Sequence, residues 1–579
     1  MKRDLLVLLL AMLLFVLGIG LNVAESRAGE ALLVVSGKVL DSSGVPLGDA
    51  SVMPYCNGKP FLTAHHSNQG HDSASVTANN GLFRLEIRSS KETISEGKWA
   101  VKITRPSFKP SPPVALHVVD QGPDKNGTSE FLANATIEMQ RFQSTAFWIA
   151  LVVFAAVYVL IAFEILHRTL AAFLGAACVL LITHTLGTFD DAYKIISYEQ
   201  ALHTVDWNVV FLLMAMMIIV GVLKVSGVFQ WLAYKSFQVA KGKIFVLSCA
   251  LCIVTATTSA VLDNVTTMLL LTPVTLEIAL VLKVSPFVFL LPEIVASNFG
   301  GTATLIGDPP NIMIGSYAGL TFNHFILNLT PVVVVVMVAQ LAYNKLLYGR
   351  TYDRAAVEDV PTMISFLKEK YRITDASVLS LGGAILLGVI LLFMLHGLFH
   401  MEVSVAALFG ASLMILVTRM DIVHILEKEI EWPSLVFFIM LFIVVGGAEQ
   451  TGILQAIADW ISSVCQGNLV LAVLIVLWVS GIASAIVDNI PYTATMLPIV
   501  AFLNKTIPGA ETGVLWWALA LGACFGGNGT IIGASANVVT TGLAEKAGHK
   551  ITFGHFVKEA APITIVSLAL SSIYLLIAY

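Results

Sequence analysis

From Ser144 to its end the chain is a succession of apolar runs, and this feature limits the possible folds most. Of 579 residues, 57% are hydrophobic and 12% are charged, whereas about 25% are charged in ordinary soluble domains. A helix that crosses the hydrocarbon core needs ~20 such residues. We therefore expect an all-α polytopic membrane protein over this part. The net charge of −5 excludes a nucleic-acid-binding chain.

The apolar runs predict ten crossings and two re-entrant hairpins. The crossings are expected near residues 145–166, 169–187, 208–226, 286–318 (interrupted), 327–347, 376–398, 402–419, 433–449, 513–545 (interrupted) and 559–578. The hairpins are expected near residues 244–282 and 469–504.

A polar stretch, Ser259–Thr267, separates two apolar runs that are each too short to cross the membrane. It contains Asp263 and recurs as Ser484–Tyr492, which contains Asp488. An ionisable residue at membrane depth is costly and marks a functional site by default. The two aspartates are therefore the first candidates for function.

The second half of the membrane part repeats the first. The matching motifs, about 225 residues apart, are Asp206-Trp207 with Glu431-Trp432, Gly221 with Gly446, Asp263-Asn264 with Asp488-Asn489, and Gly300–Asn311 with Gly526–Asn537. Each half holds five crossings, an odd number, so the second copy is expected to be inverted. We predict transporter repeats at 145–347 and 376–579, joined by a cytoplasmic linker at 348–375. Inverted repeats with discontinuous helices are typical of secondary transporters, which bind substrate and coupling ion near the midplane.

Two hairpin tips and two interrupted crossings leave free backbone groups at helix ends, which suit ions. Carboxylate, amide and hydroxyl oxygens add hard ligands, and the glycines let the backbone come close to a ligand. The candidate ion- or substrate-binding residues are Ser259, Asp263, Asn264, Thr266, Asn298, Gly300, Gly301, Thr302, Thr304, Asp308, Asn311, Ser484, Asp488, Asn489, Gly526, Gly527, Asn528, Thr530 and Asn537.

The coupling ion is expected to be Na⁺ or H⁺, and no other cofactor is expected. Na⁺ is possible at Asp263, Asn264, Asp488 and Asn489, while Asp263, Asp488 and Glu293 are possible proton carriers. Several of these residues have a second interpretation. Asn311 and Asn537 are at least as good as helix caps, and Asp308 is equally a substrate determinant or a turn residue. No Lys or Arg lies at the centre of a span, so we expect helix ends, hydroxyls and a bound cation, rather than a basic side chain, to hold an anionic substrate.

The N-terminal part differs from the rest. Residues 1–28 have the layout of a signal peptide or signal anchor. Residues 31–140 carry short β-like runs and resemble the carboxypeptidase-regulatory-like β-sandwich, so we expect a small exported domain. Asn126 and Asn134 begin glycosylation sequons, and His65, His66 and His71 lie in a polar stretch for which solvation is favoured over metal binding.

The distribution of positive charge predicts the orientation. With residues 31–144 on the extracytoplasmic side, seventeen Lys and Arg residues lie inside and two, Lys194 and Lys505, lie outside. Such an excess inside is the rule for membrane proteins. We expect a multi-pass protein of the cell (inner or plasma) membrane, or of an organelle membrane in a eukaryote.

The motifs at the breaks resemble the ArsB/NhaD/P-protein branch of the ion transporter superfamily (citrate transporter-like membrane domain), above all the melanocyte P protein-like permeases. The residues that carry the likeness are Leu262–Thr267, Thr272–Thr275, Ser297–Asn311, Val487–Pro498 and Leu519–Asn537. The resemblance implies two inverted repeats, each with a scaffold part and a transport part, and a homodimer. It implies an ATPase partner only for an arsenite pump.

Sodium-coupled relatives carry Ser-Asn-Thr motifs at the hairpin tips. Here the tips read Asp263-Asn264-Val265-Thr266 and Asp488-Asn489-Ile490-Pro491, which favours proton or cation exchange over a dicarboxylate substrate. The sequence predicts a secondary active ion transporter, not an enzyme, that moves a small inorganic or organic ion with Na⁺ or H⁺ by alternating access. The alternatives are an anion (chloride) channel of the P-protein kind and an arsenite or antimonite efflux permease. In a third interpretation the exported domain is a sensor or binding module that regulates the membrane part.

Overall fold

The computed structural model describes residues 30–41, 46–47, 50–61, 75–77, 81–105, 108–123, 129–140, 143–354 and 360–579. The chain divides near residue 141 into two compact units, a β-rich unit before it and a helical unit after it. The predicted signal segment 1–28, the histidines at 65, 66 and 71 and the sequon at Asn126 lie outside the described residues.

The β-rich unit contains two sheets. One has the strand order β5-β1-β9-β8, and the other has β3-β2-β6-β7 with β4 paired to β2. The strands are β1 (Glu30–Asp41), β2 (Ser51–Cys56), β3 (Lys59–Pro60), β4 (Ser75–Val76), β5 (Leu82–Ser90), β6 (Trp99–Thr104), β7 (Val114–Ala115), β8 (Val119–Pro123) and β9 (Ser129–Met139), with helix α2 (Lys91–Glu96) after β5. Alternate residues such as Leu33, Val101 and Ile103 are fully buried, as expected for strands with one face on a core. Asn134 is exposed on β9, where its side-chain oxygen accepts a hydrogen bond from the Ser36 hydroxyl.

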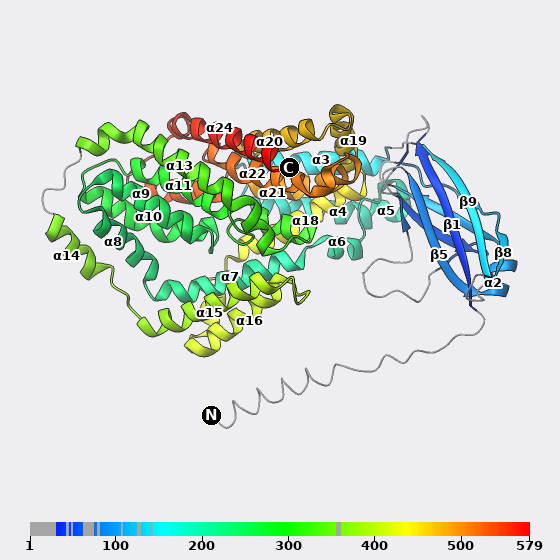
Figure 1. Ribbon diagram of the computed structural model, residues 1–579, viewed down its shortest axis with the longest axis horizontal. Helices are drawn as coiled ribbons and strands as arrows, with labels where there is room; N and C mark the ends of the chain where they lie inside the picture. Colours follow the sequence, from blue (N-terminus) through cyan, green and yellow to red (C-terminus); the bar gives the residue numbers. More distant parts are fainter. Residues whose placement is uncertain are drawn as a thin grey trace, which may run out of the picture. The chain divides into compact units, whose positions relative to one another are not determined.

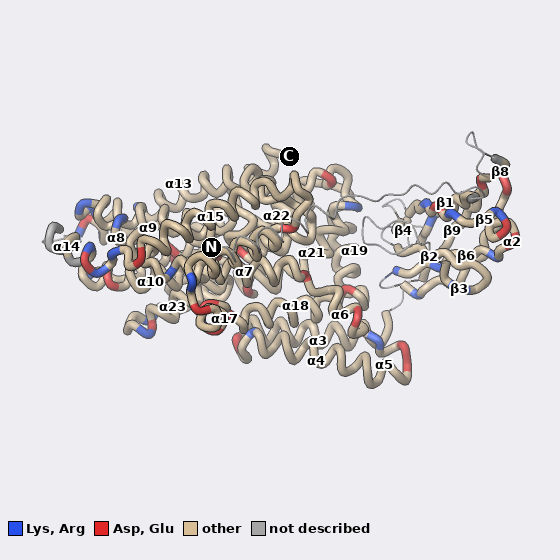
Figure 2. Tube along the Cα trace, turned by 90° about the horizontal axis from the view of Figure 1, so that it is seen from below, with Lys and Arg blue, Asp and Glu red and all other residues tan. Residues whose placement is uncertain are grey.

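The helical unit is a bundle of apolar helices whose charged residues gather at helix ends (Figures 1 and 2). Its longer helices are α3 (Thr145–Ala162), α4 (Arg168–His184), α7 (Trp207–Val225), α8 (Val228–Ala240), α9 (Ile244–Ser259), α10 (Asn264–Val281), α11 (Phe287–Thr302), α12 (Pro309–Ala318), α13 (Phe322–Arg354), α14 (Val360–Lys370), α15 (Ala376–Leu395), α16 (Val403–Thr418), α18 (Trp432–Gln450), α19 (Ile453–Cys465), α20 (Leu469–Ile486), α21 (Asn489–Thr506), α22 (Val514–Gly526), α23 (Ser535–Lys546) and α24 (Phe553–Ala578). Short helices are α5 (Leu186–Phe189), α6 (Tyr198–Thr204), α17 (Ile422–Lys428), η1 (Asp191–Tyr193), η2 (Ala510–Thr512) and η3 (Gly527–Gly529).

Within the described residues, nine helices are long and apolar enough to cross a membrane. Seven of them coincide with predicted crossings, and the other two, α10 and α20, belong to the predicted hairpins. The apolar runs of the hairpins are shorter than their helices because the polar residues beside each tip are helical as well. The two predicted interrupted crossings are indeed each two helices, α11 with α12 and α22 with α23.

Helices of the two halves make matching contacts. Helix α10 contacts α23, and its counterpart α21 contacts α12, the counterpart of α23. In the same way α7 contacts α16 while α18 contacts α4. Every one of these contacts joins one half of the chain to the other, so neither half forms its bundle alone.

The amphipathic helices α8 and α19 were not predicted from the apolar runs. Each follows a tight turn after a long helix, at Gly227 (φ 77°) and Gly452 (φ 85°), a conformation that glycine adopts at no steric cost. These two glycines belong to motifs that recur between the halves. The recurrence therefore reports a shared turn rather than a ligand site.

The segment between the halves is shorter and more ordered than the predicted linker at 348–375. Helix α13 continues to Arg354, and α14 follows at Val360. Lys370 and Tyr371 both bind the carboxylate of Glu277 at the end of α10. Burial beside that carboxylate raises the pKa of the Tyr371 phenol, so the bond keeps its proton on the tyrosine. The Thr374 hydroxyl donates to the Val225 carbonyl (2.7 Å).

Glycines allow each hairpin to pack directly on its broken helix. A Cβ atom at Gly300 would lie 2.1 Å from the carbonyl oxygen of Ala256, and one at Gly526 would lie 2.2 Å from that of Gly481. Neither glycine has a positive φ, so small size rather than a special turn is the requirement. The close approach that the glycines permit is to the backbone of the hairpin.

We expect Gly300→Ala and Gly526→Ala to destabilise the protein by about 1–3 kcal/mol, because backbone atoms must move to admit the methyl group. The matched control is Gly388→Ala on α15, where the new Cβ meets nothing within 4 Å and helix propensity favours alanine by up to ~1 kcal/mol. Thermal unfolding in detergent, followed by tryptophan fluorescence, measures the difference. Equal melting temperatures for all three variants would contradict this packing.

Candidate functional site

The two predicted hairpin tips each carry an aspartate that caps the second helix. The Asp263 carboxylate accepts hydrogen bonds from the backbone N–H (2.8 Å) and the hydroxyl (2.5 Å) of Thr266. The Asp488 carboxylate accepts from the Ile490 N–H (3.0 Å). Capping is the usual use of aspartate at a helix start. Asp263 uses both carboxylate oxygens locally, whereas Asp488 keeps one free for partners elsewhere.

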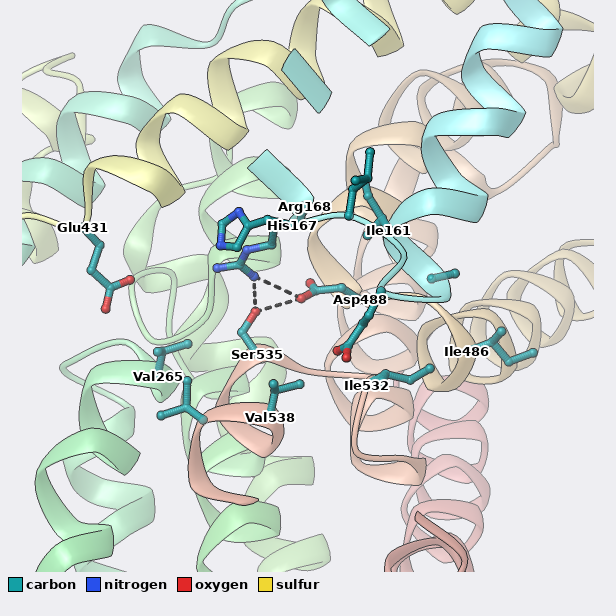
Figure 3. Close-up of a pocket in the computed structure, with 14 residues that line it drawn as sticks. Ile161, His167, Arg168, Val265, Glu431, Ile486, Asp488, Ile532, Ser535 and Val538 are labelled. Carbon is teal, nitrogen blue, oxygen red and sulfur yellow. Dashed lines mark hydrogen bonds and ion pairs between the residues drawn. The ribbon is translucent and has the colours of Figure 1, made fainter. Parts of the chain in front are cut away.

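Asp488 is paired with Arg168, the first residue of α4. An Arg168 Nη1 lies 3.2 Å from Asp488 Oδ2, and the Ser535 hydroxyl donates to the same oxygen at 2.7 Å. Arg168 also donates to the hydroxyls of Ser535 and Ser434 and lies over the ring of Phe437. Figure 3 shows this triangle of Arg168, Asp488 and Ser535. The guanidinium thus joins helices α4 and α18 to the second hairpin and the second broken helix.

A cavity of about 390 Å³ surrounds this pair. Its polar lining includes Arg168, Asp488, Ser535 and Glu431, the residue before α18. Val265 brings the tip of the first hairpin to the same cavity. Glu431 lies close enough to interact electrostatically with both Asp263 and Arg168. The cavity and its edge therefore hold more acidic than basic charge, which favours a cation, while the one guanidinium offers a site for an anion.

The breaks themselves are held by two threonines in equivalent places. The Thr304 hydroxyl donates to the Ala260 carbonyl, and the Thr530 hydroxyl donates to the Ala485 carbonyl, both at 2.5 Å. Each hydroxyl also accepts a backbone N–H, from Gly307 for Thr304 (3.2 Å) and from Gly533 for Thr530 (3.1 Å). Since irregular backbone at membrane depth must find partners inside the protein, these hydroxyls fasten each hairpin to its broken helix.

The asparagines at the start of the second half-helices complete the breaks. The Asn311 amide donates to the carbonyls of Thr302 (3.0 Å) and Thr304 (2.8 Å), and the Asn537 amide donates to those of Gly527 and Thr530, both at 2.8 Å. Of the two interpretations left open by the sequence, these bonds match the structural one, because the donors are occupied by backbone.

A buried chain of amides connects the two halves behind the cavity. Asn264 donates to Asn298 (3.1 Å), and Asn298 donates to Asn528 (2.9 Å) and Asn537 (3.1 Å). Asn489 lies 3.4 Å from both carboxylate oxygens of Asp308. The Asn528 Nδ2 is buried and has no hydrogen-bond partner. A buried donor without a partner is costly, so this amide is a place where a ligand oxygen would be stabilised.

The other predicted residues have mainly local bonds. The hydroxyls of Ser484 and Thr302 donate to the carbonyls of Ala523 and Asn298, and the Ser259 hydroxyl accepts from Ser297. The remaining predicted glycines, Gly301 and Gly527, pack against the backbone of Gly307 and Gly533. Of all the predicted binding residues, Asp488 is the one that lines the cavity within the described part of the chain.

Arg168 corrects the expectation that a basic side chain would not reach the breaks. The sequence places it in a short connection between two spans, where it counts only as a cytoplasmic charge. Its side chain instead reaches the second hairpin, 320 residues further on in the chain. Ser434, Glu431 and Ser535 were missed as well. A lone arginine beside so short a connection was the available signal, but its partner depends on the fold.

The bundle and this polar cavity define a multi-pass membrane transporter. The family model described as "Citrate transporter" (CitMHS) matches residues 158–522, and the chain belongs to that family. It is 43% identical over 433 residues to an uncharacterized transporter of Mycobacterium tuberculosis, covering 74% of this chain and 98% of that one.

Two further similarities are more distant. The chain is 31% identical over 506 residues to the human P protein, which confirms the resemblance in the motifs, and the match covers 74% of this chain and 60% of that one. The solved structure of the YdaH transporter from Alcanivorax borkumensis matches 71% of this chain and 98% of its own with 16% identity and a TM-score of 0.48.

We expect the Arg168–Asp488 pair to contribute measurably to stability, because the two side chains are only 26% and 12% exposed. A double-mutant cycle of Arg168→Gln and Asp488→Asn should give a coupling of about 1–3 kcal/mol. Melting temperatures of the four proteins in detergent measure it.

The matched control is the Lys224–Glu429 pair, which has a similar separation of 3.1 Å but a 47% exposed lysine. Its coupling should stay below about 1 kcal/mol. Strictly additive effects of the Arg168 and Asp488 substitutions would show that the pair contributes no interaction energy.

Proposed function

We propose that the chain is a secondary active ion transporter that works by alternating access, with its site in the cavity around Asp488. One observation carries the proposal. Asp488, at a hairpin tip, binds at once to Arg168 of α4 and to Ser535 of a broken helix. A single ion at this point would contact parts of the chain that must separate if the hairpin and broken helix move as one body. The site would then bind in one arrangement and release in the other.

The proposed architecture is a pair of inverted repeats. In support, the contacts between α10 and α23 and between α21 and α12 are reciprocal, as a pseudo-two-fold axis requires. The hairpins and broken helices would form the transport part, fastened together by Thr304 and Thr530. Helices α3, α4, α7 and α13, with α15, α16, α18 and α24, would form the scaffold, and the scaffolds of two chains would pair in a homodimer.

The pair of opposite charges suggests how two ions are coupled. The coupling cation, Na⁺ or H⁺, would bind Asp488 and take the place of the Arg168 guanidinium. The freed guanidinium would then bind an anionic substrate, since arginine recognises planar anions such as carboxylates through paired hydrogen bonds. A small organic anion is therefore the substrate class we favour, and citrate, named in the family description, is the first to test.

The proposed orientation places the β-rich unit outside the cytoplasm and the start of α4 toward the cytoplasm, in a cell or organelle membrane. Arg168 and Ser434 begin α4 and α18 and are linked by a hydrogen bond of 3.2 Å. Both helices would thus enter the membrane from the same side. The cavity beside them would face the cytoplasm in the arrangement described.

We expect Asp488→Asn and Asp263→Asn to reduce ion-coupled flux at least tenfold, because each removes a carboxylate charge at a hairpin tip while keeping the cap. The assay is uptake by proteoliposomes of citrate, chloride or arsenite under imposed Na⁺ or H⁺ gradients. The matched control is Asp421→Asn, which changes an exposed aspartate that caps α17 by accepting from the Val423 N–H (3.0 Å).

Asp421→Asn should transport at the wild-type rate, and all variants should keep the wild-type elution volume in detergent. Coupled flux that persists in both tip variants would contradict the assigned site. A current that needs no gradient of a second ion and does not saturate would contradict the transporter and favour a channel.

A further inference from the structure

A second buried carboxyl group, Glu293 on α11, lies in a polar cluster within the first half of the helical unit. Its side chain is fully buried. One carboxylate oxygen accepts a hydrogen bond from the Thr275 hydroxyl of α10 at 2.9 Å, and the other, Oε2, has no hydrogen-bond partner. An ionised carboxylate in such a place would lack compensation for the water that it has lost. Either a proton or a cation must neutralise it.

Helix α13 presents a polar stripe to this region. Gln340, Asn344, Tyr348 and Tyr352 recur every fourth residue, and all four are buried. Residues at this spacing share one face of a helix. The Gln340 amide donates to the Pro292 carbonyl (2.6 Å), and the Tyr352 hydroxyl donates to the Val288 carbonyl (2.9 Å). The stripe therefore lies along the turns of α11 that lead to Glu293.

The unpartnered oxygens favour a proton. The Gln340 side-chain oxygen has no hydrogen-bond partner, and neither has the hydroxyl of Thr272, one turn before Thr275 on α10. A proton on Glu293 Oε2 would turn an unpaired acceptor into a donor. The Gln340 oxygen, on a residue already bonded beside Glu293, is an acceptor of the right kind. One proton would thus satisfy two buried groups.

The charges around Glu293 do not replace that proton. Of the titratable groups on neighbouring helices, Cys252 and Tyr352 interact electrostatically with Glu293. Glu277 of α10 is paired with Lys370, and Glu559 of α24 is bound by the Tyr348 hydroxyl. The Lys345 ammonium lies over the ring of Phe245, 5.5 Å from its centre.

The far end of the stripe reaches exposed groups. Tyr348 binds Glu559, and Glu559 lies 3.8 Å from His555, whose side chain is 51% exposed. Protons can therefore exchange with solvent at His555 and Glu559, next to the buried stripe. The positive-inside pattern assigns this end of α13 to the cytoplasm.

The cluster occurs in one half of the chain only. At the repeat offset, the counterparts of Glu293, Gln340 and Asn344 are Leu519, Ser571 and Leu575. The caps, clasps and broken helices recur in both halves, so they serve the shared fold. A buried acid that one half lacks serves something else.

We propose that Glu293 is a proton-binding site, separate from the Asp488 cavity, that takes up H⁺ from the cytoplasmic side along the α13 stripe. The step adds a proton from solvent to the Glu293 carboxylate and gives the neutral carboxylic acid, with no other bond made or broken. The inference deepens the proposed function, because it names H⁺ as a coupling ion and assigns it a place.

Infrared difference spectroscopy tests the proposal without transport. The purified full-length protein in detergent is stepped between alkaline and acidic pH, and the C=O stretch of a buried carboxylic acid is recorded. We expect one such band to be lost in Glu293→Gln and to move in Glu293→Asp. Gln340→Leu should shift it toward the frequency of a free acid, since the acceptor is gone.

The matched control is Glu277→Gln, which changes the partly exposed, ion-paired acid of α10 and should leave the band unchanged. A full-strength band in Glu293→Gln, or a band lost in Glu277→Gln, would overturn the proposal. So would melting temperatures that rise with NaCl but not with choline chloride and lose that response in Glu293→Gln, because the site would then bind Na⁺. Failure of the flux assay leaves this band unaffected, so the two proposals fail separately.

Discussion

A carboxylate can lie at the tip of a membrane hairpin only if something neutralises it, and for Asp488 that partner is Arg168. An acidic side chain at the centre of a transmembrane helix costs about 2.5–3.5 kcal/mol, and a guanidinium 3.2 Å away offsets much of that cost. The same bond fixes where α4 and the second hairpin lie relative to each other. In the proposed cycle it is also the bond that an ion must replace, so one interaction stabilises the resting arrangement and controls the departure from it.

The second constraint is that every interrupted helix must have its backbone groups satisfied. Thr304 and Thr530 each do this with one hydroxyl that both donates and accepts. Asn311 and Asn537 bond the carbonyls that remain. The polar residues of the breaks therefore have two tasks. The threonines and asparagines make each hairpin and its broken helix one body, while Arg168, Asp488 and Ser535 face the cavity.

Much of this arrangement could be predicted from the sequence because it depends on local pattern. Apolar runs gave the long helices, and the recurrence of Asp263-Asn264 as Asp488-Asn489 gave the tips. The division of roles could not be predicted, because Arg168 meets its partner only through the packing of α4 against α18. Helices α8 and α19 were missed for a related reason, since their periodicity is amphipathic and too short for a span. Asp263, equivalent to Asp488 in sequence, bonds locally, and only the fold distinguishes the two.

The central claim is that the cavity around Asp488 is reached from both sides of the membrane in turn. Val265 lines it from the tip of the first hairpin, so the direct measurement is labelling of Val265→Cys, in a Cys178→Ser background, with a membrane-impermeant maleimide. The assay compares right-side-out and inside-out vesicles, with Leu387→Cys on the exposed face of α15 as the control. The account predicts labelling from both sides, slowed from either side by the ion that proves to be transported. Labelling from one side only, unchanged by any transported ion, would contradict it.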